Sequence, residues 1–404
     1  MTRRAMLTTA LAAPAILKGA SRTWSEVEKL LASGNVKGRL AKADLPTPAL
    51  CVDLDALESN IKRMAAFAKQ NGRAFRPHGK THKCSEIALR CQSAGAVGAC
   101  AAKVSEAEVF AARGVKGILV TTAMVGRYRI ERGVKLASRV PDSILVVDNA
   151  QNATELNDAA KAAGVKVNVA IDLNVSNRTG IMPGEAGAAL AVHISKLSNL
   201  KFQGVQSYAG HASHVIGFEK RTAVSQEAMG KAVETRRLIE AQGVPCPWLS
   251  GGSTGTYNID AKIDGVTELQ PGSFLFMDVD YNKIGGTKGE FYDDFANSLT
   301  VLATVSSKPT DDFAVVDAGL KSFATDKPFG PVVKSIEGVT YSFAGDEHGK
   351  LDLKQAARAV QLGDRLELII PHCDPTVNLY DRMYMTRGDQ VEAVWKIDAR
   401  GMNM

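Results

Sequence analysis

Short apolar runs alternate with amphipathic segments along the chain from Thr47 to about residue 290. The run at 49–54 precedes a segment at 55–72 in which apolar residues recur every three to four positions, the spacing of a helix with one buried face. Further apolar runs, separated by helix-like or glycine-rich segments, stand at 117–122, 143–149, 165–173, 202–210, 247–253 and 267–276. Strand and helix alternate about eight times, which predicts an α/β fold of the parallel (β/α)8 barrel type, with an open doubly wound sheet as the alternative.

The pattern changes near Ala296. Strand-like runs then follow one another with almost no helical periodicity between them, at 298–307, 313–323, 338–344, 364–372 and 391–398. This pattern predicts an all-β C-terminal domain appended to the barrel. The predicted division is a leader at 1–21, an N-terminal segment at 22–46, the barrel at 47–290 and the β domain at 291–404.

The composition is that of a folded protein, because 45% of the 404 residues are hydrophobic and 23% are charged. The net charge of +6 is mild, and the chain has no lysine- and arginine-rich run of the kind that binds nucleic acid, so nucleic acid is not an expected partner. The six cysteines form neither a CxxC pair nor a regular framework, so a disulfide scaffold is not expected.

The first twenty residues differ from the rest of the chain. Arg3 and Arg4 precede an apolar stretch of about a dozen residues, which is too short to span a bilayer. This arrangement resembles a twin-arginine export signal and predicts a periplasmic protein. The alternative is a mildly apolar N-terminal tail on a cytoplasmic protein, and neither alternative includes a membrane-spanning segment.

The stretch "FRPHGKTHK" at 75–83 concentrates side chains that are costly to bury. In an extended strand His78, Lys80 and His82 share one face, so a lysine would lie between two imidazoles. Neighbouring cations and burial lower the pKa of a lysine, which makes its amine a nucleophile near neutral pH. The hypothesis is therefore a catalytic Lys80 at a strand end, and the alternative is a basic, solvated edge strand.

Other polar side chains also follow predicted barrel strands, at the ends where the active site of such a barrel lies. They are Asp172, Arg178, Tyr208 and His211. Late in the barrel, residues 250–257 combine three glycines with four serine and threonine residues, so their N–H and hydroxyl groups could bind a phosphate. A phosphate site late in the barrel and a Schiff-base lysine early in it suggest pyridoxal phosphate held at both ends.

The β domain contributes the stretch "PHCD". In extended structure His372 and Asp374 share a face and Cys373 lies on the other, a spacing that suits a divalent metal bound by one imidazole and one carboxylate. The alternative is a polar turn without a metal. Carboxylate ligands favour manganese or magnesium over zinc.

These motifs resemble one known family, the pyridoxal phosphate enzymes of the alanine racemase fold type, in the branch of D-threonine aldolase and D-serine dehydratase. The resemblance runs from Leu45 to Tyr384, and its most specific parts are "RPHGKTHK", "SGGSTGTY", "ELQPGSFLFMD", "VVDAGLKS" and "PHCD". One departure is Gly79, where many relatives have a different residue.

The resemblance implies a role for each matching residue. Lys80 would form the Schiff base, and His372 with Asp374 would hold the divalent metal. The residues that would bind or line the cofactor are Arg178, Tyr208, Gly252, Ser253, Thr254 and, as a weaker candidate, Tyr281. The candidate general base is His211 or a metal-bound hydroxide. A homodimer is also expected.

The implied function is a metal-dependent aldolase that cleaves a D-3-hydroxy amino acid to glycine and an aldehyde. Aspartate at 374 favours this activity, because dehydratase members of the family typically have cysteine there. The alternatives are a D-serine or D-3-hydroxyaspartate dehydratase, which gives a 2-oxo acid and ammonia, and a non-catalytic pyridoxal phosphate carrier. The substituent on Cβ stays open among D-threonine, D-phenylserine and D-3-hydroxyaspartate.

Overall fold

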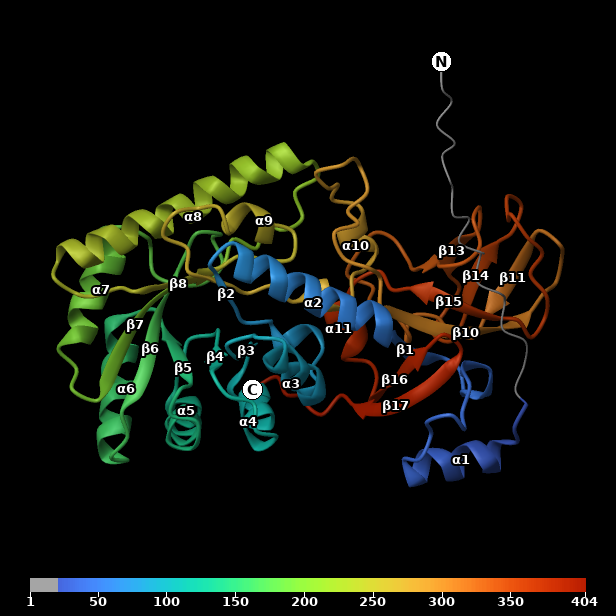
Figure 1. The fold of residues 1–404 in the computed structure, drawn as a ribbon, viewed down its shortest axis with the longest axis horizontal. Coiled ribbons are helices and arrows are strands. Elements are labelled where there is room, and N and C mark those ends of the chain that lie inside the picture. The colour runs from blue at the N-terminus through green and yellow to red at the C-terminus, as the bar shows by residue number, and fades with distance from the viewer. Residues whose placement is uncertain (1–20) are drawn as a thin grey trace, which may run out of the picture.

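The computed structural model describes residues 21–404, and in them an eight-stranded parallel sheet forms a barrel (Figure 1). The strand order is β2-β9-β8-β7-β6-β5-β4-β3, and a parallel bridge between His78 and Cys100 joins the two ends of this series. The barrel strands are β2 (Ala74–Phe75), β3 (Ala99–Ala101), β4 (Ile118–Val120), β5 (Ile144–Val147), β6 (Val167–Leu173), β7 (Leu200–Ser207), β8 (Trp248–Gly251) and β9 (Glu268–Leu269). The predicted barrel is confirmed.

Helices cover the outside of the barrel and bury their apolar sides on its strands. They are α2 (Leu54–Gln70), α3 (Ser85–Ser93), α4 (Val104–Ala112), α5 (Arg127–Arg139), α6 (Ala150–Ala162), α7 (Glu185–Ser195) and α8 (Phe218–Ala241). Two short helices, α9 (Tyr257–Asp260) and α10 (Val279–Asn282), follow β8 and β9. Capping defines where α2 begins, because the Asp53 carboxylate accepts the N–H groups of Asp55 and Ala56. Among residues 21–404, no helix is both long enough and apolar enough to cross a membrane.

A second sheet, of nine strands in the described residues, forms the predicted β domain. Its order is β13-β14-β11-β10-β1-β16-β17, with β15 paired to β10 and β12 paired to β15. The strands are β1 (Ala49–Asp53), β10 (Leu299–Ser307), β11 (Phe313–Val316), β12 (Val332–Val333), β13 (Thr340–Phe343), β14 (Gly349–Asp352), β15 (Arg365–Ile369), β16 (Arg382–Arg387) and β17 (Gln390–Lys396). One short helix, α11 (Cys373–Val377), lies between β15 and β16.

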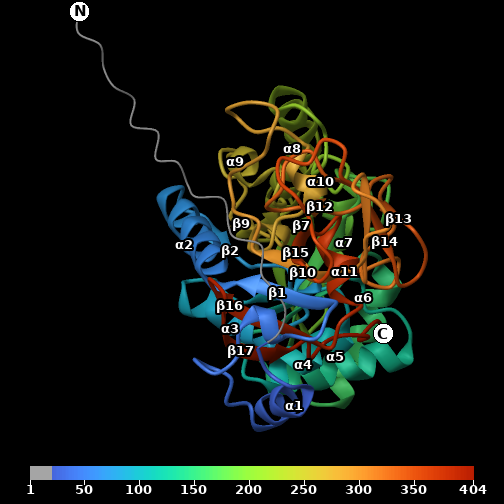
Figure 2. The ribbon, with the colours of Figure 1, turned by 90° about the vertical axis from the view of Figure 1, so that its right-hand side faces the viewer.

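Strand β1 corrects the predicted boundary at residue 47. It pairs antiparallel with β10 and parallel with β16, so it belongs to the second sheet and not to the barrel (Figure 2). Its residues alternate between two buried surfaces, since Leu50 and Val52 join the main core while Ala49 and Cys51 face another cluster. Because both faces of β1 are covered, its sequence is an uninterrupted apolar run, the same pattern that a buried barrel strand has.

The segment at 22–46 covers the other face of this sheet. Its helix α1 (Trp24–Ser33) and the loop after it bury apolar side chains against β1, β10, β16 and β17. They include Val27, Leu30, Val36, Leu40 and Leu45. The predicted export signal at 1–21 lies outside the described residues apart from Ser21.

Inside the barrel, Arg76 and Glu268 form a buried ion pair. Arg76 donates from Nε and Nη2 to the two carboxylate oxygens of Glu268, at 2.9 and 2.8 Å, and from Nη1 to the carbonyl of Gly117. Glu268 also accepts the hydroxyl of Ser250 at 2.8 Å. These bonds link β2, β8, β9 and the start of β4 across the barrel. Arg76, which makes most of them, lies four residues before Lys80 in the chain.

Candidate active site

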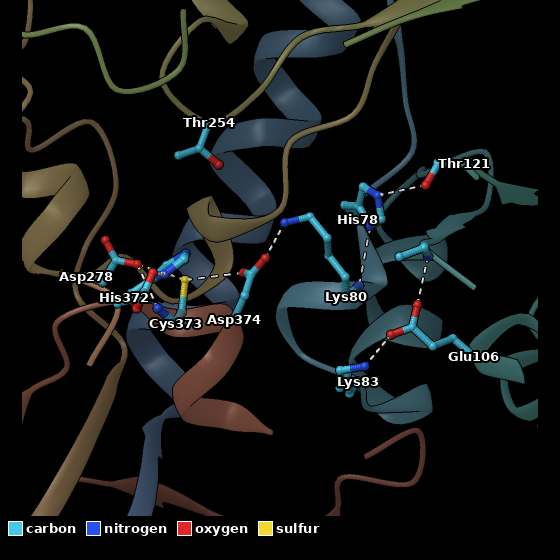
Figure 3. A network of polar contacts seen from close by, with 12 residues as sticks. His78, Lys80, Lys83, Glu106, Thr121, Thr254, Asp278, His372, Cys373 and Asp374 are labelled. Carbon is cyan, nitrogen blue, oxygen red and sulfur yellow. Dashed lines mark hydrogen bonds and ion pairs between the residues drawn. The ribbon is translucent and has the colours of Figure 1, made fainter. Parts of the chain in front are cut away.

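Lys80 lies in a short 3-10 helix (Gly79–Thr81) that follows β2. The predicted extended strand through 75–83 is wrong, because the strand ends at Phe75 and the chain turns after His78. The turn directs the Lys80 amine at the carboxylate of Asp374 on α11, with which it forms an ion pair (Figure 3). The barrel lysine and the carboxylate of the β domain thus meet in one site.

The two imidazoles do not flank Lys80 as cations. His78 is buried, accepts the N–H of Lys80 at Nδ1 and contacts the hydroxyl of Thr121 through Nε2 at 3.3 Å. His82 is fully buried and its Nδ1 accepts the N–H of Cys84 at 3.0 Å. Burial lowers the pKa of His78 well below its ordinary value and lowers the pKa of His82 to about 4, so both rings are neutral near pH 7.

The expected lowering of the Lys80 pKa is also wrong for this structure. Burial alone would lower the pKa of Lys80, but the neighbouring Asp374 carboxylate outweighs it and raises that pKa. Burial likewise opposes ionisation of Asp374, yet the Lys80 ammonium holds its pKa well below the ordinary value. The two groups are therefore a charged pair.

Gly79, where the sequence departs from many relatives, has no room for a side chain. A Cβ atom there would lie 2.4 Å from the ring of Phe110 and 2.9 Å from the carbonyl of Cys100. The turn that carries Lys80 therefore packs directly on β3 and α4. Glycine fits this close approach of backbone to ring.

His372 and Asp374 begin a helix and do not lie on one extended strand, which corrects the predicted geometry. His372 is the N-cap of α11, and Asp374 lies in its first turn. Between them, Cys373 donates its thiol proton to Asp278 at 3.0 Å and its backbone N–H to the same oxygen at 2.9 Å. Cys373 is fully buried, and burial raises its pKa well above the ordinary value, so it is a structural thiol.

The donor set around α11 limits how a metal could be held. No three His, Cys, Asp or Glu side chains of residues 21–404 come together as a metal cluster, so the protein offers at most the predicted pair. His372 suits a ligand role, because its Nδ1 lies 2.7 Å from the Asp326 carboxylate and its Nε2 keeps a lone pair available. The pair fits a metal whose remaining ligands are water or substrate.

The glycine-rich loop after β8 (residues 252–255, the anion loop) presents buried N–H donors without an acceptor in the described residues. The backbone N–H groups of Gly252, Thr254 and Gly255 have no acceptor among residues 21–404, although all three residues are buried. Gly252 has φ +79°, and a Cβ atom there would lie 2.8 Å from the Asp260 carboxylate, so this position requires glycine. Ser213, whose backbone carbonyl packs on Gly255, also has a buried hydroxyl without a partner. These donors fit a phosphate group.

Ser253 and Thr254 hold this loop in shape. The backbone N–H of Ser253 donates to the hydroxyl of Thr256 at 3.1 Å, and Thr256 in turn donates to Asp260 at 2.6 Å. The hydroxyl of Thr254 accepts the N–H of Phe274 at 2.9 Å. The loop also lies near the turn that carries Lys80, because Phe274, which bonds to Thr254, closely follows Gly272, where a Cβ atom would lie 2.5 Å from the hydroxyl of Thr81 (Figure 3).

Arg178 and Tyr208 come together at the mouth of the barrel. The guanidinium of Arg178, which is exposed, lies 5.0 Å from the centre of the Tyr208 ring. Tyr281 is buried nearby, and burial, together with the phenol of Tyr208 and the acidic groups of α11, holds its pKa well above the ordinary value. These three predicted residues border the space around Lys80.

His211 lies apart from this cluster. It is exposed and lines a groove between the loop after β6 and α8, together with Glu227 and Lys231. His214, three residues later, contacts the site instead, since its ring centre lies 4.5 Å from that of Tyr281. Sequence analysis missed His214, because both histidines follow the same strand and the loop between them has no periodicity.

A carboxylate lies beside His214. The Nδ1 atom of His214 lies 2.9 Å from Oδ2 of Asp280, and the amine of Lys327 lies 2.7 Å from the same oxygen. Although burial opposes it, these two partners hold the pKa of Asp280 well below its ordinary value. Lys327 is adjacent to Asp326, so one loop of the β domain contacts His372 directly and also contacts Asp280, the carboxylate beside His214.

The barrel, the lysine after its first strand and the buried anion loop define the class as a pyridoxal phosphate enzyme of the alanine racemase fold type. The family model "Alanine racemase, N-terminal domain" matches residues 52–280, and "Putative serine dehydratase domain" matches residues 298–386. The chain belongs to this family. Its membership supports pyridoxal phosphate as the cofactor, which the donors of the anion loop fit.

The chain is similar to several characterised proteins over nearly their whole length. It is 39% identical to a D-threonine aldolase from an Arthrobacter species, over 90% of this chain and 94% of that protein. It is 36% identical to a 3-hydroxy-D-aspartate aldolase from Paracoccus denitrificans, over 89% and 93%. The crystal structure of D-threonine aldolase from Filomicrobium marinum matches with a TM-score of 0.86 and 36% identity, over 89% of this chain and 97% of that one. The resemblance inferred from the motifs is confirmed.

Proposed function

We propose that this protein is a pyridoxal phosphate and divalent-metal dependent aldolase that cleaves a D-3-hydroxy amino acid of the D-threonine kind to glycine and an aldehyde. The observation that carries the proposal is the meeting of Lys80 with Asp374 in one site bordered by the anion loop. Lys80 would bind the cofactor, and the residues at the start of α11 would bind the metal that acts on the substrate hydroxyl. Both aldolase relatives described above support the same reaction class.

The chain's residues have distinct roles toward the cofactor. Lys80 would hold it covalently through its amine, and the N–H groups of Gly252, Thr254 and Gly255 would hold its phosphate. Arg178 and Tyr208 would border its ring. When bound, pyridoxal phosphate supplies an acceptor for the electron pair released when the Cα–Cβ bond of the substrate breaks.

The metal would be held by Nε2 of His372 and the carboxylate of Asp374. When bound, a divalent ion there lowers the pKa of the substrate's β-hydroxyl. An imidazole with a carboxylate favours manganese or magnesium. Asp326 would keep His372 in the tautomer that can bind a metal, through its contact with Nδ1.

His214 replaces His211 as the proposed general base. With Nδ1 lying 2.9 Å from Asp280, the Nε2 atom of His214 can take the proton of the β-hydroxyl as the carbon–carbon bond breaks. The Asp280 carboxylate would orient the ring and stabilise the imidazolium that forms. Protonation at Cα then completes glycine.

A dehydratase is the alternative, and one similarity favours it. The chain is 30% identical to a D-threo-3-hydroxyaspartate dehydratase from a Delftia species, over 80% of this chain and 88% of that protein. The aldolase proposal ranks higher because the residue that faces Lys80 from α11 is an aspartate, whereas Cys373 donates its thiol to Asp278. A non-catalytic carrier would need neither α11 nor its two candidate ligands.

The two activities differ in their products. The manganese-loaded protein, incubated with D-threonine, is expected to form equal amounts of glycine and acetaldehyde. Formation of 2-oxobutanoate and ammonia instead would establish the dehydratase. D-phenylserine and D-3-hydroxyaspartate assayed in parallel would identify the preferred Cβ substituent, and chelator treatment is expected to abolish turnover with every substrate.

We also propose twin-arginine export and a homodimer. Replacing Arg3 and Arg4 by lysine is expected to leave the active protein in the cytosol, because the signal requires both arginines and the residues of the candidate site all lie later in the sequence. Periplasmic activity that is unchanged by this double substitution would contradict export. Sedimentation of the purified full chain tests the dimer.

A further inference from the structure

Arg221, on the first turn of α8, is a fully buried cation without an acidic partner. Its side chain is 0% exposed, and no carboxylate of residues 21–404 lies within ion-pair distance of it. The guanidinium donates only to backbone carbonyls, those of Gly255 at 2.8 Å, Val215 at 2.8 Å, Ile284 at 2.8 Å and Gly285 at 2.7 Å. A buried charge normally has a counter-charge, so this one requires an explanation.

The four carbonyls belong to three loops that meet at the candidate site. Gly255 is part of the anion loop. Val215 directly follows His214, and Ile284 with Gly285 follows α10, which carries Tyr281. Arg221 therefore fixes the three loops relative to one another through bonds that a guanidinium fork can make at once.

The anion loop is held from behind. The carbonyl of Gly255 accepts from Nε of Arg221, and the carbonyl of Thr254 accepts the hydroxyl of Tyr292 at 2.5 Å. With these carbonyls bound on the outer side, the N–H groups of Gly252, Thr254 and Gly255 are left for a ligand. The ring of Tyr292 also lies 5.8 Å from the guanidinium, so both supports pack together.

The positive charge of Arg221 is not neutralised by its surroundings. After the phenol of Tyr292, the acidic group with the strongest influence on the pKa of Arg221 is Asp294, whose carboxylate already accepts the hydroxyl of Tyr257 at 3.0 Å and lies 3.9 Å from Arg63. One buried cation thus stands directly behind a loop whose N–H groups have no acceptor. Such a cation attracts an anion on the other side of the loop.

We propose that Arg221 is a positioning residue whose charge, together with its four carbonyl bonds, builds the site for the cofactor phosphate. The inference rests on the proposed function, because it takes pyridoxal phosphate as the ligand. It adds that the phosphate dianion is the counter-charge of Arg221. Phosphate binding should therefore depend on a side chain that does not touch the phosphate.

The test compares two ligands that differ only in the phosphate. The full-length protein freed of cofactor is titrated with pyridoxal phosphate and with pyridoxal, and the absorbance of the lysine-bound ring gives both dissociation constants. Their ratio measures the phosphate contribution. We expect Arg221→Met to reduce this ratio about ten- to a hundredfold, on the order of 1.4–2.8 kcal/mol. We expect Arg221→Lys, which keeps the charge, to retain the ratio within about threefold while binding both ligands more weakly.

Arg236 on the same helix provides a matched control. It donates to the carbonyl of Gly265 at 2.7 Å and to Glu240 at 3.1 Å, away from the anion loop, so Arg236→Met should leave the ratio unchanged. Equal weakening of both ligands by Arg221→Met would show a purely structural role and overturn the inference. If Arg221→Met does not fold, the Arg221→Lys variant decides the question. A ratio of dissociation constants that falls tenfold or more in Arg221→Lys, although the charge is retained, would also overturn the inference. A wild-type protein that binds neither ligand would refute the proposed function instead.

Discussion

Removing Arg76 should destabilise the barrel more than any surface charge does. The side chain is 6% exposed, and Glu268 opposite it is 2% exposed. In Arg76→Met, Glu268 would lose both guanidinium bonds and keep only the hydroxyl of Ser250. Taking one partner from a buried ion pair costs about 3–5 kcal/mol, because the other charge is left uncompensated.

The double variant Arg76→Met, Glu268→Gln tests the source of this cost. It removes the uncompensated charge, so the loss in the free energy of unfolding should shrink to about 1–2 kcal/mol. In the single variant, protonation of the Glu268 carboxylate would also remove the uncompensated charge. The folded state then binds more protons than the unfolded chain, so the deficit of Arg76→Met should be larger at pH 8 than at pH 5.

Urea unfolding followed by circular dichroism measures these differences, with every variant in the same cofactor state. Arg237→Met serves as the control, because its ion pair with Glu234 is exposed and should contribute nothing measurable. A loss for Arg76→Met that equals the control, or a double variant less stable than the single one, would refute the reasoning.

Four further outcomes are expected. Borohydride reduction of the holoenzyme should fix a pyridoxyl group on the peptide containing Lys80, and label elsewhere would overturn its role. Asp374→Ala should keep that label yet lose at least about a hundredfold in carbon–carbon cleavage, whereas wild-type turnover after chelation would exclude a metal role. His214→Gln should lower kcat about a hundredfold and His211→Gln should not, and the reverse result would restore the first assignment. Burial lowers the pKa of His82 to about 4 from an ordinary value of 6.5. The free energy of unfolding should therefore fall by up to about 3 kcal/mol between pH 6.5 and pH 4, as the unfolded chain takes up a proton that the folded protein does not. An equally steep fall in His82→Gln would contradict this cause.

Local patterns predicted most of the fold. Continuous apolar runs such as Ile144–Val147 are fully buried, as parallel strands covered on both faces must be, and they alternate with amphipathic helices. Strand β1 followed the same pattern and was misplaced. Its partners, β10 and β16, lie about 250 and 330 positions later in the chain, and no local signal distinguishes such pairing from a barrel strand.

The site was predictable in its members but not in its electrostatics. The lysine, the anion loop and α11 were found from their motifs and from their positions after strands. The pKa of Lys80 depends on Asp374, which is 294 positions away, so the expected direction of its shift was wrong. The choice between His211 and His214 depends on which ring contacts Tyr281, and this requires the folded loop.

The position of β1 also constrains how the protein can be made. The strand lies between β10 and β16, so the β domain uses residues from both ends of the chain, and the barrel is in effect an insertion within it. During synthesis β1 leaves the ribosome long before β10 and β16 have been synthesised, so the barrel can fold first while β1 is still unpaired. A fragment that ends near residue 290 would lack both neighbours of β1 and leave a bare strand edge prone to aggregation, so the two halves cannot be separated by a single cut.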